Sequence, residues 1–431
     1  MKKIKHYSVP HLLHIETTYI CNSKCIFCYN PNRKSKINYK ILDRIVEKVW
    51  KEQIPHVYLI GGEPSLLNIE KLNEYIEMLS EVSSVTIVTN GIKYLKNLSK
   101  NLACIGIPVH GTKETHEFVT KVKAFDKSVS SIRRYVDQGF DLRCIPVLMS
   151  INYDQIYQII EFADKLKMSN VFIDRFESGG IGSKLMEKLK PSNEQFKESI
   201  TQIIKAKNDF EIPIGFGTAI PWCIDERLIE EELISDCGVG ITFAAINPKG
   251  DLRICNQSPI VYGNILNESI GEIWNKKSIN DYRNLEWITE PCRSCTLVYD
   301  CICGCKVDVS FTKKYCVDYA VRDMKESPFK NFKPKIDRDF NLDYPKKNRT
   351  FEISPYSKSN LIHKEKYIVT RYQTVELDKT ALKMYMDIKN GINNETELIN
   401  KYSNIIDIEN IRKFVSKLVF IDSIRVKGLD T

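Results

Sequence analysis

Three cysteines near the N-terminus have the spacing of a loop that binds a metal cluster. Cys21, Cys25 and Cys28 form a C-x3-C-x2-C pattern in the stretch ICNSKCIFCY at residues 20–29. Three thiolates on one tight loop can hold three irons of a 4Fe–4S cluster, whose usual ligand set is four cysteines. The fourth iron would then be open to bind and reduce a small molecule. The spacing by itself also allows a zinc loop with its fourth ligand elsewhere, or three unrelated buried thiols.

Two glycine-containing turns follow the next two predicted strands. The first turn consists of Gly61, Gly62, Glu63 and Pro64, and the second contains Asn90 before Gly91. Adjacent glycines let the backbone approach a ligand closely, and proline fixes the turn. The Glu63 carboxylate could meet the ammonium group of a ligand. Each turn sequence by itself is also compatible with an ordinary turn.

The segments that must position these residues alternate between strand and helix over residues 12–220. Such alternation predicts an α/β fold with a parallel sheet curled toward a partial (β/α)6 barrel of the TIM type. Active sites of such folds lie at the carboxyl ends of the strands, and the cysteine loop directly follows the first strand. The predicted strands are Leu12–Thr18, His56–Ile60, Val85–Thr89, Cys104–Val109, Arg143–Leu148 and Val171–Phe176, and the predicted helices are Tyr39–Lys51, Ile69–Leu79, Val129–Gln138 and Tyr153–Leu166.

A second group of cysteines lies between residues 223 and 316. The chain has 14 cysteines and no secretory signal, which argues against a disulfide framework and favours metal binding. Cys104 and Cys144 lie in apolar strand segments, and we expect both to be buried structural thiols. The remaining cysteines are Cys223, Cys237, Cys255, Cys292, Cys295, Cys301, Cys303, Cys305 and Cys316. Their density predicts a metal-stabilised domain, and a zinc-ribbon domain is the alternative to an iron–sulfur domain.

Composition and the positions of proline residues suggest three domains and a linker. We expect the barrel over residues 1–220, the cysteine-rich domain over 221–324, a proline-broken linker over 325–350 and a small α+β domain over 351–431. No stretch approaches the roughly 20 apolar residues of a membrane span, so we expect a cytoplasmic protein without membrane contact. The net charge of +8 forms no concentrated basic tract, which does not favour nucleic acid as a partner.

The N-terminal motifs resemble those of the radical S-adenosylmethionine superfamily. The cysteine loop matches the family signature, including its aromatic Phe27, and Gly61–Pro64 matches the family's GGEP turn. The resemblance implies that the open iron chelates S-adenosylmethionine, whose methionine amino group contacts the GGEP turn. Cleavage of the sulfonium bond would then give a 5′-deoxyadenosyl radical that abstracts hydrogen from a substrate. Phe27 and Tyr29 would lie near the adenine, and Asn90 is a candidate for the ribose side.

The later cysteines resemble the SPASM extension of that superfamily at seven positions. The resemblance implies two auxiliary 4Fe–4S clusters, which makes three clusters in the chain. One would use Cys237, Cys255 and Cys305, and the other Cys292, Cys295, Cys301 and Cys316. Cys223 is the natural fourth ligand of the first cluster, although its separation from Cys237 is long. That cluster could instead keep an open iron for a substrate thiolate, and Cys303 is additional to the pattern.

The C-terminal domain resembles the RiPP recognition element, a small winged-helix-like clamp for leader peptides. Its expected order is two strands over 366–371 and 373–377, followed by three helices. The resemblance implies a precursor peptide whose leader adds a strand to this domain. A generic winged helix is the alternative. A DNA-binding version would need a basic recognition helix, and Glu409 opposes the basic residues of the last helix.

The combined resemblance implies a radical enzyme that modifies a ribosomally synthesised peptide. We expect thioether or carbon–carbon crosslinks, and an electron donor such as flavodoxin or ferredoxin. One alternative is an anaerobic sulfatase-type maturase or another SPASM oxidoreductase of cofactor biosynthesis. Sulfatase maturases place an aspartate base after the cysteine that matches Cys255, whereas this chain has Asn256. A non-catalytic iron–sulfur or zinc scaffold for peptide or DNA is the other alternative, and it leaves the Gly61–Pro64 turn unexplained.

Overall fold

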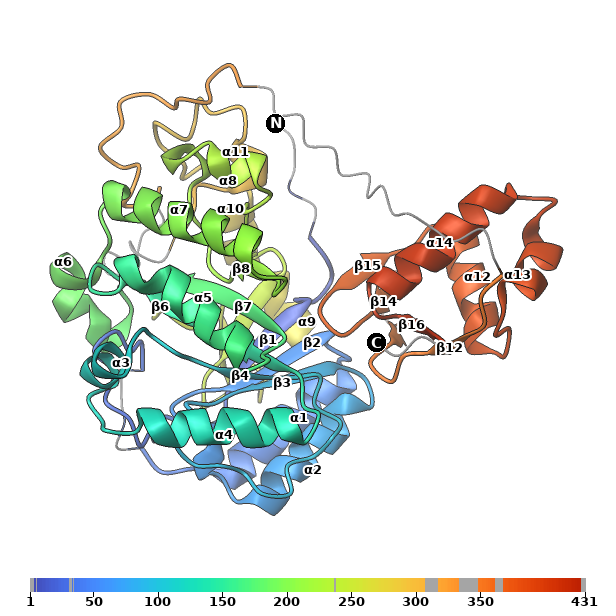
Figure 1. The fold of residues 1–431 in the computed structure, drawn as a ribbon, viewed down its shortest axis with the longest axis horizontal. Helices are drawn as coiled ribbons and strands as arrows, with labels where there is room; N and C mark the ends of the chain where they lie inside the picture. The colour runs from blue at the N-terminus through green and yellow to red at the C-terminus, as the bar shows by residue number, and fades with distance from the viewer. Residues whose placement is uncertain are drawn as a thin grey trace.

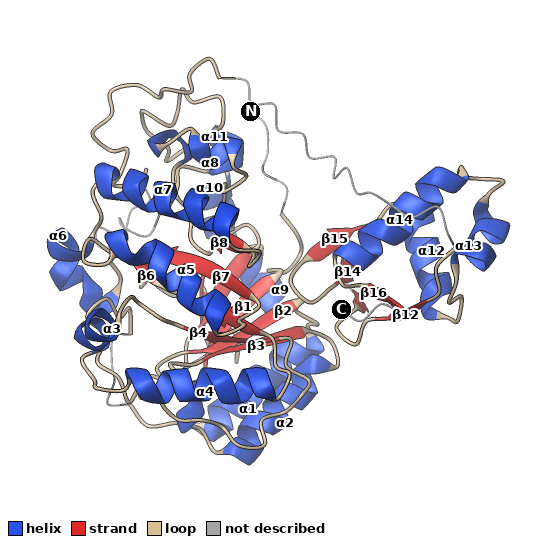
Figure 2. Ribbon diagram, viewed as in Figure 1, coloured by secondary structure: helices blue, strands red, loops and turns tan. Residues whose placement is uncertain are grey.

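The protein consists of a large α/β unit with a smaller C-terminal lobe beside it (Figure 1 and Figure 2). The computed structural model describes residues 4, 6–30, 33, 35–235, 238–306, 317–332, 348–358 and 367–427, and the backbone alone of 359–360. Strands occupy the centre of the large unit, and helices cover their outer side (Figure 2). Within the described residues, no helix is long and apolar enough to cross a membrane.

The large unit is built around a predominantly parallel sheet, as the alternating pattern predicts. Neighbouring strands pair in the order β1-β2-β3-β4-β5-β7, and β8 continues from β7. Among the described strands, β8 is not paired with β9 at the other end, so the sheet remains open. The bounds are β1 Leu12–Glu16, β2 His56–Ile60, β3 Ser84–Val88, β4 Cys104–Ile107, β5 Leu142–Cys144, β6 Val147–Leu148, β7 Asn170–Arg175 and β8 Ile214–Phe216.

Amphipathic helices pack on this sheet through their apolar faces. In α1 (Tyr39–Lys51), which has the predicted bounds, the buried residues Leu42, Ile45, Val46 and Val49 follow helical spacing, and the Asn38 side chain caps the first turn. The long helix α7 (Asn193–Asp209) was not predicted, although Ser192 and Gln195 form a capping box at its start. The others are α2 Ile69–Ser80, α3 Lys113–Thr120, α4 Phe125–Asp137, α5 Ile156–Lys165 and α6 Met186–Leu189, with 3-10 turns η1 Pro64–Leu66, η2 Tyr153–Gln155 and η3 Gly180–Leu185.

The sheet continues into the cysteine-rich segment. Strand β9 (Phe243–Ile246) pairs in parallel with β1, and β10 (Asp251–Arg253) and β11 (Gly263–Asn264) extend the same edge in antiparallel. One apolar core therefore spans both predicted domains. Phe329, from the predicted linker, is buried against this segment, and its carbonyl accepts a 2.6 Å hydrogen bond from Thr296. The short helices here are η4 Trp222–Ile224, α8 Arg227–Glu230, α9 Ile270–Trp274, α10 Lys277–Arg283 and α11 Val298–Cys301.

The C-terminal lobe has its own apolar core between small sheets and three helices. Both predicted strands and all three predicted helices are present, and the winged-helix assignment stays a prediction. One sheet pairs β12 with β16, and the other has the order β13-β14-β15. The bounds are β12 Phe351–Ile353, β13 Lys358–Asn360, β14 Tyr367–Val369, β15 Thr374–Glu376, α12 Lys379–Lys389, α13 Glu395–Tyr402, α14 Ile408–Phe420 and β16 Ile424–Val426.

The β14–β15 hairpin docks the lobe onto the amino ends of the barrel strands (Figure 1). Arg371 at the hairpin tip forms a 2.8 Å ion pair with Asp141, which directly precedes β5. Tyr372 donates a hydrogen bond to the same carboxylate. The carbonyl of Arg371 accepts a 2.6 Å hydrogen bond from Ser84, the first residue of β3. The cysteine loop follows the opposite, carboxyl end of β1, so the lobe sits on the face away from that loop.

Replacing the docking arginine by alanine, Arg371→Ala, is expected to loosen the hairpin. A hydrogen-bonded charged contact contributes about 1.5 to 3 kcal/mol, so docking should weaken by about that amount. Amide hydrogen exchange over residues 367–376 should become faster in the variant. Lys401→Ala is the matched control, because it breaks a more exposed ion pair with Asp387 within the same lobe. Equal exchange in the two variants would show that the ion pair does not hold the lobe.

Candidate functional site

The cysteine loop is held at the carboxyl end of β1 by backbone hydrogen bonds on both sides. On one side, the amides of Lys24 and Ile26 donate to the carbonyls of Thr120 (2.9 Å) and Val119 (3.0 Å) at the end of α3. On the other side, the amide of Ile181 in η3 donates to the carbonyl of Cys28 at 2.9 Å. The loop conformation is therefore fixed by its neighbours in the fold.

The three thiols of the loop are partly accessible, and a backbone amide is directed at one of them. The backbone amide of Ser23 lies 3.4 Å from the sulfur of Cys21, and the Ser23 hydroxyl lies 3.3 Å from the sulfur of Cys25. The amide of Ser23 stabilises a Cys21 thiolate once it is formed, while the Ser23 hydroxyl donates to the carbonyl of Thr120 at 3.1 Å. Burial raises the pKa of the Cys21 thiol to about 12 and that of Cys25 to about 11, so ligation to a metal must release protons.

The described residues contain no ready-made site for a single metal ion. No group of three His, Cys, Asp or Glu side chains within them converges as the ligands of one ion. Thiolates that bind different irons of one cluster have no need to converge on a point. Three cysteine thiols on one loop are a donor set compatible with such a cluster.

The Gly61–Pro64 turn lies directly against the chain that leads into the cysteine loop. The amide of Gly62 donates to the carbonyl of Thr18 at 2.6 Å, and that of Glu63 donates to Ile20 at 2.8 Å. Gly61 has a φ of +138°, and a Cβ atom there would overlap the carbonyl oxygen of Thr18. The predicted proximity of loop and turn is therefore present, and it requires glycine.

The Glu63 carboxylate forms hydrogen bonds with neighbouring groups of the protein. It accepts hydrogen bonds from the amide of Ser65 (2.9 Å), the hydroxyl of Thr89 (2.5 Å) and the amide of Asn90 (2.8 Å). The side chain is 1% exposed, and burial raises its pKa while these hydrogen bonds oppose the rise. Glu63 thus ties the ends of β2 and β3 together, a role that its sequence position does not reveal.

Asn90 connects the third strand end to the cysteine loop. Its side-chain amide donates a 2.7 Å hydrogen bond to the side chain of Asn22, between the first two cysteines. The side-chain oxygen of Asn90 accepts from the amide of Ile92 at 2.9 Å. The loop and both turns therefore form one hydrogen-bonded edge, while a ribose contact by Asn90 stays a prediction.

Phe27 and Tyr29, the aromatic residues predicted to lie near the adenine, contact different neighbours. The ring of Phe27 meets the buried ring of His110 edge-on, with 5.0 Å between centroids. The backbone of Tyr29 lies against Gly180, where a Cβ atom would overlap the carbonyl oxygen of Tyr29. His110 accepts a 3.2 Å hydrogen bond from the amide of Val147, which links the segment after β4 to the start of β6. The contacts of Phe27 and Tyr29 with adenine stay predictions.

A buried ion pair at the end of β1 was not predicted from the sequence. Glu16, 0% exposed, lies 2.5 Å from Arg253 of β10. Burial raises the pKa of Glu16, and the charge of Arg253 opposes that rise. Arg253 also donates to the carbonyls of Asn256 (3.0 Å) and Ser258 (3.2 Å), just after Cys255. The pair therefore couples the first barrel strand to the second group of cysteines.

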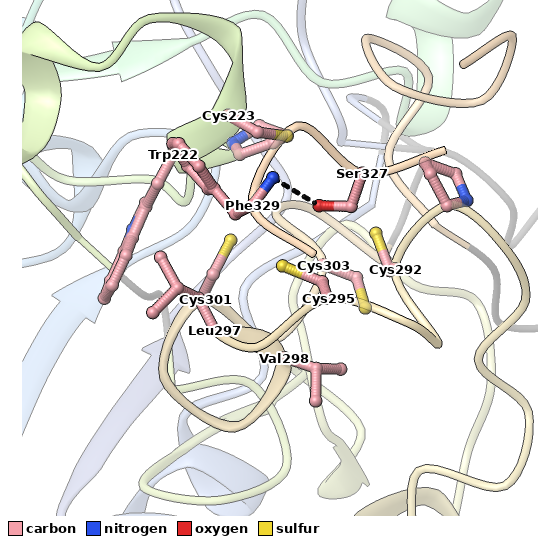
Figure 3. A pocket seen from close by; sticks show the side chains of 12 residues that line it. Trp222, Cys223, Cys292, Cys295, Leu297, Val298, Cys301, Cys303, Ser327 and Phe329 are labelled. Carbon is pink, nitrogen blue, oxygen red and sulfur yellow. Dashed lines mark hydrogen bonds between the residues drawn. The ribbon is translucent and has the colours of Figure 1, made fainter. Parts of the chain in front are cut away.

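Among the described residues, five cysteines of the second group line one pocket and two others lie outside it. Cys223 lines a small pocket together with Cys292, Cys295, Cys301 and Cys303 (Figure 3). Cys255 and Cys305 do not line this pocket. The sulfur of Cys305 instead lies 3.0 Å from the Glu177 carboxylate, and the amide of Gln257 lies 3.4 Å from the sulfur of Cys255. Two further predicted ligands, Cys237 and Cys316, lie outside the described residues.

Comparison with protein families identifies two domains in the chain. Residues 15–163 match the Radical SAM superfamily, and residues 237–296 match the iron–sulfur cluster-binding SPASM domain. The first match contains the cysteine loop and both turns. The second begins at Cys237 and ends just after Cys295.

Individual relatives are distant. A probable GTP 3′,8-cyclase of Saccharolobus islandicus is 29% identical over 188 residues, which cover 39% of this chain and 58% of that protein. The chain thus spans less than two thirds of this relative. A PqqA peptide cyclase of Gluconobacter oxydans is 23% identical over 303 residues, which cover 67% of this chain and 83% of that protein. SuiB of Streptococcus suis, bound to the precursor peptide SuiA, shares the fold with a TM-score of 0.59 at 19% identity, over 74% of this chain and 77% of SuiB.

Proposed function

Because this chain is a radical S-adenosylmethionine protein of the SPASM type, we propose that it is an enzyme that modifies a ribosomally synthesised precursor peptide. Its cofactors are S-adenosylmethionine and three 4Fe–4S clusters, one that binds S-adenosylmethionine and two auxiliary ones. Thioether or carbon–carbon crosslinks are the proposed products. A flavodoxin or ferredoxin is the proposed electron donor.

One observation carries this proposal: the cysteine loop and both glycine turns form a single edge. Hydrogen bonds join Thr18 to Gly62, Ile20 to Glu63 and Asn22 to Asn90. Three thiols on one fixed loop beside a glycine backbone fit a cluster with a small ligand next to it. A scaffold protein needs no such second element beside its cysteines.

The residues of this edge have distinct proposed roles. Cys21, Cys25 and Cys28 would hold the first cluster, with the Ser23 amide donating to the sulfur of Cys21. Gly61 and Gly62 would let the backbone approach the methionine end of the cofactor. When bound, the cofactor and its cluster supply a 5′-deoxyadenosyl radical that abstracts hydrogen from the substrate.

The C-terminal lobe, residues 351–431, is the proposed clamp for a leader peptide. The relationship to a PqqA peptide cyclase and the shared fold of peptide-bound SuiB support a peptide substrate. The lobe docks at the amino ends of the strands, whereas the cysteine loop lies at their carboxyl ends. A strand rises about 3.3 Å per residue, so the length of β1 corresponds to about 16 Å. The peptide must therefore span at least this depth between its clamped leader and its modified residues.

Peptide-dependent turnover tests this function. The anaerobically reconstituted full chain is incubated with S-adenosylmethionine, dithionite and a cysteine-containing precursor peptide encoded by a neighbouring gene. We expect 5′-deoxyadenosine to form and the peptide to lose about 2 Da for each crosslink, because each crosslink removes two hydrogen atoms. Mass spectrometry measures both products. Formation of 5′-deoxyadenosine with an unchanged peptide would contradict this substrate assignment.

A further inference from the structure

Asp174 lies at the carboxyl end of β7, and we propose that it is a catalytic residue whose carboxylate accepts the proton that the peptide releases when a crosslink forms. The inference rests on the proposed function and adds to it the group that takes up this proton. Asp174 lies on the same face of β7 as Phe172. Val171 and Ile173, on the opposite face, are buried in the apolar core, where α5 packs on β7. Asp174 therefore faces the inner side of the curled sheet.

The chain that follows Asp174 contacts both groups of cysteines. The amide of Ile181 donates to the carbonyl of Cys28 at 2.9 Å. The Glu177 carboxylate lies 3.0 Å from the sulfur of Cys305. Asp174 precedes Glu177 by three residues, so it lies at the start of the segment that joins the two groups.

Strand β6 connects Asp174 to the cysteine loop from its other side. Val147 of β6 pairs in register with Asp174, and the amide of Asp174 donates to the carbonyl of Pro146 at 2.9 Å. Val147 packs in the same apolar cluster as Phe27 of the cysteine loop. One residue, Val147, therefore links Asp174 to the loop that would hold the first cluster.

The Asp174 carboxylate is half-buried and, among the described residues, accepts no hydrogen bond. The other acidic side chains near this end of the barrel have partners. Glu16 and Asp318 each form an ion pair with an arginine, and Glu63 accepts hydrogen bonds from three groups. The Glu177 carboxylate contacts a cysteine thiol. Asp174 is thus the carboxylate here that stays available to a substrate.

Gly217, which follows β8, leaves room for this carboxylate. A Cβ atom at position 217 would lie 2.4 Å from Oδ1 of Asp174. Gly217 and Phe172 also line a cavity of about 390 Å³, which continues to Phe243 of β9. Since β8 and β9 are not paired, this cavity lies at the open edge of the sheet. A peptide side chain can therefore approach the carboxylate.

The surroundings of Asp174 suit a proton acceptor at neutral pH. Burial raises the pKa of Asp174 to about 7, the charge of Glu177 adds to the rise, and the guanidinium of Arg143 opposes it. The strands on either side present Val147 and Gly217, which do not titrate. A general base is most effective when its pKa lies near the working pH.

Neighbouring polar groups are less suited to this role. Asn256, directly after Cys255, carries an amide that is not a base, and its side chain forms hydrogen bonds with His14 and Tyr29. Burial lowers the pKa of His14 to about 3, so this imidazole takes up a proton only in acid. Asp174 is therefore the better candidate.

The proposed crosslinking step requires such an acceptor. Each crosslink removes two hydrogen atoms from the peptide, and the 5′-deoxyadenosyl radical takes the first to become 5′-deoxyadenosine. When the new bond forms, the bond between the second peptide group and its hydrogen breaks. Asp174 accepts that hydrogen as a proton, and the remaining electron passes to an oxidised auxiliary 4Fe–4S cluster.

The ratio of the two products tests the assignment in Asp174→Asn. The reconstituted full chain is incubated with S-adenosylmethionine, dithionite and the precursor peptide. Crosslinking should slow at least about 100-fold, while 5′-deoxyadenosine formation stays within about twofold, because only the second step needs the base. Asp174→Glu keeps a carboxylate and should crosslink at least about tenfold faster than Asp174→Asn. Asp137→Asn, at an exposed position at the end of α4, is the matched control and should crosslink normally.

Three results of this experiment would overturn the assignment. They are normal crosslinking by Asp174→Asn, an equal loss of both products, and equal crosslinking by Asp174→Asn and Asp174→Glu. An unchanged peptide with the unsubstituted chain would instead contradict the proposed function.

Titration provides a second measurement. With the unsubstituted chain, crosslinking should rise with pH through a midpoint near 7, because only the ionised carboxylate accepts a proton, and Asp174→Asn should lack this step. Infrared difference spectra of the reconstituted chain are recorded between about pH 6 and about pH 8, without S-adenosylmethionine or peptide. A carboxyl C=O band should disappear over this range in the unsubstituted chain and be missing in Asp174→Asn. Identical spectra of the two chains would overturn the assignment, whatever the outcome with the peptide.

Discussion

Replacing Cys21, Cys25 and Cys28 together by alanine is expected to reduce 5′-deoxyadenosine formation to background. The three thiols are the only cysteines on the loop that follows β1, so the variant retains no thiolate there to hold irons. About four irons per chain should be lost, while the auxiliary clusters remain. Chromatography of the nucleoside products and an iron assay measure the two effects.

The matched controls for this variant are Cys104→Ala and Cys144→Ala. Both thiols are buried in barrel strands, at 1% and 0% exposure, and neither lies on the cysteine loop. Their replacement should cost some stability by leaving small cavities, but activity and iron content should persist. Continued formation of 5′-deoxyadenosine by the triple variant would show that the site lies elsewhere.

Replacing Asp318 by asparagine is expected to lower the free energy of unfolding by about 3 to 5 kcal/mol. Asp318 forms an ion pair with Arg175 of β7, and the two side chains are 0% and 1% exposed. Its carboxylate also accepts hydrogen bonds from the amides of Cys305 (2.7 Å) and Ala320 (2.9 Å). Losing the charge leaves a buried guanidinium without its counter-ion. The midpoint of urea unfolding of the anaerobically reconstituted full chain measures the effect.

An exposed ion pair provides the control for Asp318→Asn. Lys277 and Asp281 lie 2.7 Å apart with side chains 87% and 54% exposed. Such pairs contribute about 0.2 to 1 kcal/mol, so Asp281→Asn should change the unfolding midpoint only slightly. Equal effects of the two substitutions would show that burial of the Arg175–Asp318 pair is energetically unimportant.

Local patterns were enough to predict most elements of the barrel. Helix α1 was predicted with its observed bounds because its apolar residues recur at helical spacing after a capping asparagine. Strand β2 was predicted equally well as a short apolar run before two glycines. The pairing of β9 with β1 was not predicted, because it joins residues more than 200 positions apart. Such pairing depends on the path of the whole chain.

The proximity of the three cysteines on the loop could be predicted from their spacing alone. Three cysteines within eight residues must lie close together in any compact loop, so their proximity follows from chain geometry. The ion pair between Glu16 and Arg253 left no such signal, because its members are charged residues on distant strands. Its position became clear only when β10 was placed beside the barrel strands.

The sequence by itself determined which residues are candidates to carry the chemistry: the three N-terminal cysteines, the Gly61–Pro64 turn and the later cysteine group. Spacing within a short segment limits the distances between its residues, and metal ligation needs particular side chains. Both features can therefore be recognised in the sequence. Only the tertiary structure decided how these segments combine. In the tertiary structure, Glu63 accepts hydrogen bonds from Thr89 and Asn90, and Cys223 lines the same pocket as Cys292. The C-terminal lobe lies on the face away from the cysteine loop. These contacts join residues far apart in the chain, and they arise from packing and burial rather than from any local pattern.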